Sequence, residues 1–148
     1  MTTQETTTYT TTKAVLTIEG AMAVIQAAMA KANEIGVPMT MVVVDDEGTL
    51  KTSIRMDGAN RVTIDWATEK AYTAATFRYP TNMLAQVMES SPVGMASMLK
   101  LPHMTLGPGG MPLQVGQSNV GGIGVSGGTM PEQDQQVAEA GVAALRMS

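Results

Sequence analysis

The feature that most constrains the fold of this sequence is a strand-like segment, residues 120–125, in which three of the six positions are glycine. Glycine brings no side chain to pack, so a glycine-rich strand marks a place where another group approaches the backbone closely. After Ser126, Gly127 and Gly128, the segment Thr129–Glu132 combines the S/T-x-x-E pattern of a capped helix with a proline in the first turn. We therefore expect a closely covered strand that turns directly into the last helix.

Two β-hairpins are predicted from apolar runs interrupted by turn residues. The first joins strands over 37–44 and 49–55 through Asp45–Gly48, whose glycine accepts a positive φ. Because 37–44 is rich in valine and methionine, we expect it to be the more buried strand of this hairpin. The second hairpin joins 111–115 to 120–125 through a four-residue turn that begins with glycine.

Apolar residues elsewhere recur at the three- and four-residue spacing of helices. The predicted helices cover residues 16–35, with Thr17 as N-cap and Gly36 past the end, then 63–77, 81–88, 93–99, and a last helix from 129 to about 144. The order is helix, hairpin, three helices, hairpin, helix. It predicts an α+β domain: an antiparallel sheet built from the two hairpins, with helices on at least one face.

Length and end composition indicate one domain. A chain of 148 residues matches a single domain, which we place at residues 16–148 after a flexible, threonine-rich tail at 1–15. The N-terminus lacks the basic and apolar regions of a signal peptide, and no apolar stretch approaches the roughly 18 residues of a membrane span. We expect a cytoplasmic protein that does not enter a membrane.

Charge and cysteine content exclude several kinds of partner. The net charge of −4 opposes binding to nucleic-acid phosphates, so no nucleic-acid partner is expected. With no cysteine and one histidine, the chain has neither a thiolate nor a multi-histidine metal cage. Only 15% of the residues are charged, which predicts surface buried between copies of the chain in a homo-oligomer.

The turn Ser126-Gly127-Gly128 is a candidate anion-binding site. A strand that runs through glycines into a helix N-terminus leaves backbone N–H groups free beside the positive end of the helix dipole. A carboxylate, a haem propionate or a phosphate would fit there, and the Ser126 hydroxyl would add a hydrogen bond. The alternative is a tight turn that needs glycine only for its conformation.

Three charged residues are further candidates. Arg55, at the end of a strand, would clamp a ligand carboxylate while Asp57 orients it or moves a proton; the alternative is a structural Arg55–Asp57 salt bridge. Lys70, on the alanine-rich helix 63–77, would project into a pocket as a proton carrier. Its alternative is a surface lysine that lies along the helix and pairs with Asp65.

His103 is the only histidine, and it lies in the irregular loop 101–110. A loop histidine can be a haem axial ligand, a general base or a solvated side chain. The sequence also holds 14 methionines, most of them expected to be flexible core residues. Methionine also ligates haem iron and lines apolar pockets, so both residue types stay open as iron ligands.

Five separated motifs, in this order and spacing, resemble the GlcG/HbpS-like family, which is described as haem-binding or haem-degrading. The motifs are Val44–Gly48, Arg55–Ala59, Ala67–Ala71, Gly109–Leu113 and Gly121–Gly128, the last followed by Asp134. The resemblance covers residues 16–145. It implies a compact sheet flanked by helices, assembly into dimers and up to octamers, and haem or corrinoid binding in some members. Members that bind haem through a histidine on the first helix differ from this chain, since residues 17–36 contain none.

Two main hypotheses follow. In the first, the protein binds or handles haem, with its propionates at Arg55 or at Gly127 and Gly128 and its iron facing His103 or a methionine. In the second, it is an enzyme, sensor or accessory protein of a catabolic pathway that binds a carboxylate-bearing small molecule, with Lys70 or Asp57 moving a proton. A structural accessory subunit is a third reading. We predict a site where the end of the first hairpin meets the glycine turn, joining Arg55, Asp57 and Lys70 to Ser126, Gly127 and Gly128.

Overall fold

The computed structural model describes residues 8–146 and confirms the predicted α+β fold. Its helices are α1 (Ile18–Ile35), α2 (Val62–Phe77), α3 (Thr81–Glu89), α4 (Pro92–Leu99) and α5 (Pro131–Arg146). Its strands are β1 (Thr40–Asp45), β2 (Leu50–Arg55), β3 (Gly110–Val115) and β4 (Ser118–Ser126). The predicted elements are therefore all present in the predicted order, with small differences at their ends.

The four strands form one antiparallel sheet in the order β2-β1-β4-β3. Each predicted hairpin is present, and the two hairpins join through β1 and β4 at the centre of the sheet. As expected, β1 is the buried strand of the first hairpin, while β2 forms an edge. A register shift between Val43 and Val44 pairs Val44 with Leu50, which turns Leu50 toward the same face as Val44.

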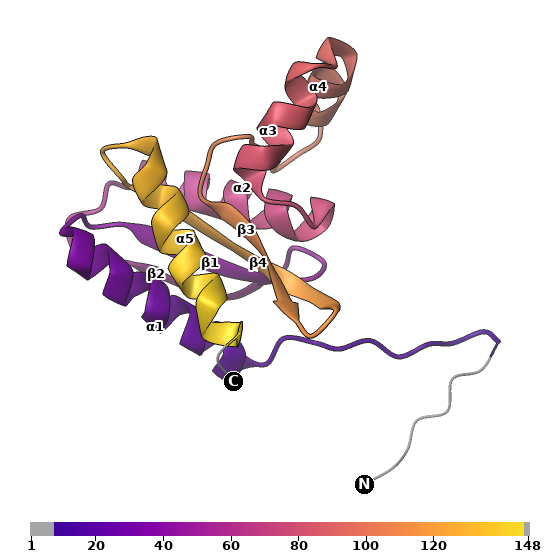
Figure 1. Cartoon of the computed structure of the whole chain (residues 1–148), viewed down its shortest axis with the longest axis horizontal. Coiled ribbons are helices and arrows are strands. Elements are labelled where there is room, and N and C mark those ends of the chain that lie inside the picture. Colours follow the sequence, from indigo (N-terminus) through magenta and orange to yellow (C-terminus); the bar gives the residue numbers. More distant parts are fainter. Residues whose placement is uncertain (1–7, 147–148) are drawn as a thin grey trace, which may run out of the picture.

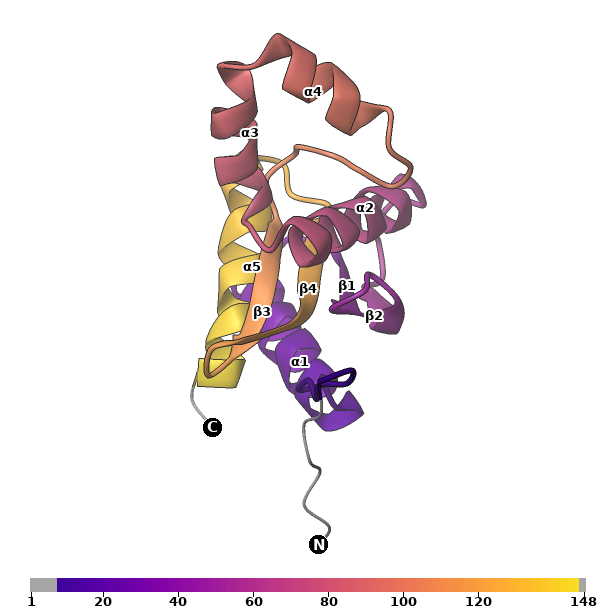
Figure 2. The same cartoon turned by 90° about the vertical axis from the view of Figure 1, so that its right-hand side faces the viewer.

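Helices cover both faces of the sheet (Figures 1 and 2). On one face α1 and α5 pack side by side and enclose the larger core, which includes Ile25, Met41, Ile123 and Val137. On the other face α2 lies across β4 and β1, and a smaller cluster holds its alanines against the valines of β1. Gly122 and Gly124 of β4 face α2, so α2 is the group whose close approach the sequence predicted. A side-chain Cβ at Gly122 would lie 2.6 Å from the Ala71 carbonyl oxygen.

The ends of the helices confirm one predicted cap and correct another. Thr17 caps α1, its hydroxyl oxygen accepting the Gly20 N–H at 3.0 Å. The expected Thr129–Glu132 capping pair is wrong: α5 begins at Pro131, and the Gln133 side-chain oxygen accepts the backbone N–H of Thr129 at 2.8 Å. Gln133 lies one position further along the helix than the S/T-x-x-E pattern assumes.

Helices α3 and α4 form an arm that projects from the body of the molecule (Figure 1). Its base is held by Thr81, whose hydroxyl donates to the Gly107 carbonyl at 2.6 Å and accepts the Gly110 N–H at 3.0 Å. Of the predicted tail, residues 1–7 lie outside the described part and 8–15 run in no regular element. Within residues 8–146, no helix is long and apolar enough to cross a membrane.

Candidate functional site

Arg55 and Ser126 lie at the same end of the sheet. Both residues pair with Thr40 of β1, so Arg55, Thr40 and Ser126 form one row across three strands. With one strand spacing between each pair of neighbours, the backbones of Arg55 and Ser126 are about 10 Å apart. The structure thus brings the end of the first hairpin and the glycine turn to one end of the sheet, with Thr40 between them.

The glycine turn holds a carboxylate of the chain itself. Gly127 adopts φ 132°, and a Cβ there would lie 2.8 Å from the Pro38 carbonyl oxygen, so both conformation and space require glycine. The N–H of Gly128 donates to Asp134 Oδ1 at 2.8 Å. Asp134, in the first turn of α5, therefore occupies the position at the Gly128 N–H where a ligand anion was expected from the sequence.

Lys70 lies in the same network. Its Nζ donates to Asp134 Oδ2 at 3.0 Å and to the Val125 carbonyl at 2.9 Å, and its side chain is 6% exposed. The suggested partner Asp65 instead pairs with Arg61 at 3.2 Å on the surface. Lys70, Val125, Gly128 and Asp134 thus connect α2, β4 and α5. Sequence reasoning missed Asp134 as the partner, although an acidic residue in the first turn of a helix was the available signal.

Arg55 is not paired with a carboxylate. Its Nη1 donates to the Ala59 carbonyl at 2.9 Å, and the ion pairs of residues 8–146 do not include the Arg55–Asp57 bridge considered above. One N–H of the guanidinium is therefore fixed by the backbone, while the side chain lines two separate hollows.

The larger hollow, here the methionine hollow, has a volume of about 420 Å³ and lies between the C-terminal half of α1 and the end of β2. It is lined by Met29, Asn33, Ile54, Arg55, Met56 and Asp57. Met29 and Met56 are both half-buried. The sequence did not single them out among 14 methionines, because their meeting depends on how α1 crosses β2.

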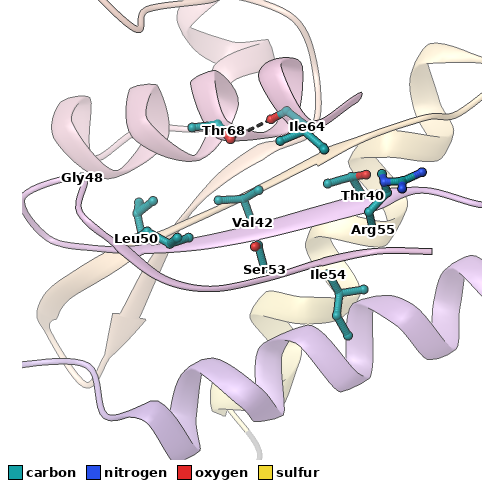
Figure 3. Close-up of a pocket in the computed structure, with 10 residues that line it drawn as sticks. Thr40, Val42, Gly48, Leu50, Ser53, Ile54, Arg55, Ile64 and Thr68 are labelled. Atoms are coloured by element: carbon teal, nitrogen blue, oxygen red, sulfur yellow. Dashed lines mark hydrogen bonds between the residues drawn. The ribbon is translucent and has the colours of Figure 1, made fainter. Parts of the chain in front are cut away.

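The smaller hollow, here the α2 groove, has a volume of about 230 Å³ and lies between α2 and the first hairpin. Figure 3 shows Val42, Leu50 and Ile64 pointing into it, with Arg55 beside Thr40 at one end; Ile54 points away toward α1. The methionine hollow and the α2 groove therefore share Ile54 and Arg55 but lie on opposite sides of β2.

His103 is remote from Arg55. It is exposed, adopts φ 70°, and sets its ring edge-on against Tyr72, with 5.5 Å between ring centroids. Thr63, near the start of α2, lies close to Arg55, because its hydroxyl shares a 2.7 Å hydrogen bond with that of Thr40, the residue that pairs with Arg55. Tyr72 follows nine residues later, which is about 13 Å along the helix. His103 and Arg55 therefore belong to different parts of the surface of one chain.

This chain is similar to known proteins both in sequence and in three-dimensional structure. A protein of Citrobacter freundii, described as an uncharacterized 15.0 kDa protein in the dhaT-dhaS intergenic region, is 35% identical over 85% of this chain and 89% of its own length. The crystal structure of a Streptomyces reticuli HbpS double mutant matches with a TM-score of 0.85 and 31% identity, covering 98% of this chain and 97% of that one.

A third match is the crystal structure of a PduOC–haem complex. It has a TM-score of 0.80 and 30% identity, and covers 88% of this chain and 95% of that one. Residues 16–143 match the model of the family described as "Haem degrading protein HbpS-like". The match spans most of the domain, including both hairpins and the glycine turn, and it agrees with the resemblance seen in the motifs. This chain therefore belongs to the HbpS-like family.

Proposed function

We propose that this protein binds haem in the methionine hollow. The observation that carries the proposal is the meeting of the guanidinium of Arg55, which has no carboxylate partner among residues 8–146, with two thioethers, Met29 and Met56. Ile54 adds an aliphatic side chain to this lining, and Asn33 and Asp57 make its remainder polar. The family description and the haem complex of PduOC, which shares the fold, support it.

The residues of the hollow fit the chemistry of haem. Thioether sulfur is a soft ligand that ligates haem iron in other proteins, and Ile54 supplies an apolar surface for the porphyrin. A volume of about 420 Å³ lies within the roughly 300–1,000 Å³ of small-molecule sites. Arg55 would hold a propionate through a charge-assisted hydrogen bond. Because Ala59 already fixes one of its N–H groups, the guanidinium loses little freedom on binding.

When bound, haem would supply redox or oxygen chemistry that the side chains of this chain do not offer. The chain would bind the propionate at Arg55, bring Met29 or Met56 to the iron, and cover one side of the ring with Ile54. Haem degradation, a small-molecule reaction, and the catalytic roles of Lys70 and Asp57 stay predictions, as does the cytoplasmic location.

Haem titration tests the proposal. We expect the wild-type protein to give a Soret band on addition of haem, and Met29→Leu or Met56→Leu to change its position, since leucine keeps the volume but removes the sulfur. Arg55→Ala should weaken haem binding by about 1.5–3 kcal/mol. His103→Ala is the matched control and should leave the spectrum unchanged. If His103→Ala shifts the band and both methionine variants do not, the iron lies at His103 and the methionine hollow is not the site.

The proposal extends to assembly. Large apolar side chains are exposed on the α3–α4 arm and directly after it, namely Met83, Val87, Val93, Leu99 and Leu101. We propose that this arm contacts another copy of the chain, in an assembly between a dimer and an octamer. Light scattering at micromolar concentration should give a mass above the 15.5 kDa of one chain, and Val87→Glu with Leu99→Glu should lower it. A wild-type protein that stays monomeric would contradict this expectation.

A further inference from the structure

The α2 groove exists because α2 packs over β4 and β1 and does not extend over the edge strand β2. Gly122 and Gly124 let the backbone of α2 approach β4, and the alanines of α2 pack there. The edge strand β2 lies on the other side of β1, so its side chains on this face are not covered by α2 to the same depth. The space left between them is the α2 groove.

The lining of the α2 groove is aliphatic along its length and cationic at one end. Val42, Val44, Leu50 and Ile64 supply the aliphatic walls, and the register shift in the first hairpin is what turns Leu50 toward the groove. Arg55 is the only charged residue of the lining. Such an arrangement complements a ligand with an apolar body and one negative charge.

Two of the hydroxyl groups in the lining are already occupied. The Thr68 hydroxyl donates to the Ile64 carbonyl at 2.6 Å, and the Thr40 hydroxyl shares a hydrogen bond with that of Thr63. The walls therefore behave as largely apolar, and the uncommitted N–H groups of Arg55 are the strongest donors available to a ligand in this groove.

We propose that the α2 groove binds a short, straight-chain aliphatic monocarboxylate, with its carboxylate at Arg55 and its chain running along β1 toward Leu50. A volume of about 230 Å³ falls below the roughly 300 Å³ at which sites for drug-sized ligands begin, so the occupant is smaller than a porphyrin. The groove follows β1 from Thr40 to Val44, a length of about 13 Å. Arg55 and Ile54 also line the methionine hollow, but Val42, Leu50, Ser53 and Ile64 line the α2 groove and not the methionine hollow, so variants at these residues test this inference separately from haem binding.

Calorimetry with the series acetate, butyrate, hexanoate, octanoate and decanoate tests the inference on the full-length protein. We expect affinity to rise about fourfold for each added CH₂ that is buried, the equivalent of about 0.8 kcal/mol. The rise should stop at the acid whose chain reaches Leu50. Hexanamide, which keeps the chain but lacks the charge, should bind roughly ten- to hundredfold more weakly than hexanoate.

Two variants locate the site. Ser53 is exposed on the groove side of β2, so Ser53→Phe should fill the groove without disturbing the core and reduce hexanoate affinity at least tenfold. Arg55→Gln should reduce hexanoate binding to the level of hexanamide. Met56→Leu, in the methionine hollow, is the matched control and should leave hexanoate binding unchanged. Circular dichroism checks that each variant is folded. An affinity that does not depend on chain length, or that survives Ser53→Phe in a folded protein, would overturn the inference.

Discussion

Replacing Lys70 by methionine is expected to lower the free energy of unfolding by about 3–5 kcal/mol, since it leaves the carboxylate of Asp134 buried without its cation. Lys70 and Asp134 are 6% and 12% exposed in their side chains, so water replaces little of the lost interaction. The Val125 carbonyl also loses the Nζ–H that donates to it at 2.9 Å. Urea unfolding followed by circular dichroism measures the loss.

A double-mutant cycle separates the ion pair from the rest of the network. Asp134→Asn keeps a side-chain oxygen that can accept the Gly128 N–H, and alone it should cost a similar amount because Lys70 stays charged and buried. In Lys70→Met with Asp134→Asn no buried charge remains, and much of the stability should return.

The exposed pair Arg61–Asp65 serves as the matched control. Its side chains are 74% and 65% exposed, so Arg61→Met should change stability by no more than about 1 kcal/mol. If Lys70→Met changed stability as little as Arg61→Met, the buried ion pair would not be a structural element. A proton-carrying role for Lys70 would then become the better reading.

The elements of the fold could be predicted because their signals are local. Turn residues predict both hairpins, and Thr17 and Gly36 mark the two ends of the first helix. The glycines of β4 indicate that another segment packs closely against this strand. The identity of that segment, α2, could not be predicted from residues near β4 in the sequence. It depends on the alanines of α2 meeting Gly122 and Gly124 from a segment some fifty residues earlier in the chain, as the sequence shows.

The candidate site was harder to predict for the same reason. Arg55 could be singled out, since an arginine at the end of a predicted strand is visible in the sequence. That it bonds the Ala59 carbonyl and not Asp57 was not visible there. Met29 could not, because only the packing of α1 against β2 brings it beside Arg55 and Met56, its neighbour in the chain. For the glycine turn, the sequence predicted backbone N–H groups available to an anion. It did not show that the anion is the side chain of Asp134, which accepts the Gly128 N–H.

Introducing a side chain at Gly124 should have the second large effect. A Cβ on Gly124 would overlap the Ala67 carbonyl oxygen and lie 2.5 Å from the Ala71 nitrogen, both in the backbone of α2. No rotamer change relieves such a contact, so α2 must move away from the sheet. We expect Gly124→Ala to lower the free energy of unfolding by about 3 kcal/mol, at the upper end of the range for overpacking, and Gly124→Val by more.

Gly20 provides the comparison, because its Cβ would meet side-chain atoms and no backbone: the end of Leu16 at 3.1 Å, the Thr17 hydroxyl at 3.3 Å and the end of Leu145 at 3.8 Å. Gly20 lies inside α1, where alanine is favoured over glycine by about 1 kcal/mol, so Gly20→Ala should be neutral or stabilising in the same urea experiment. A Gly124→Ala protein as stable as the wild type would mean that α2 does not lie this close to β4. The α2 groove depends on the same contact, because a movement of α2 away from β4 in Gly124→Ala changes the distance between Ile64 and the first hairpin. The affinity for hexanoate should therefore change in Gly124→Ala together with the stability. Gly20→Ala should leave the affinity for hexanoate unchanged.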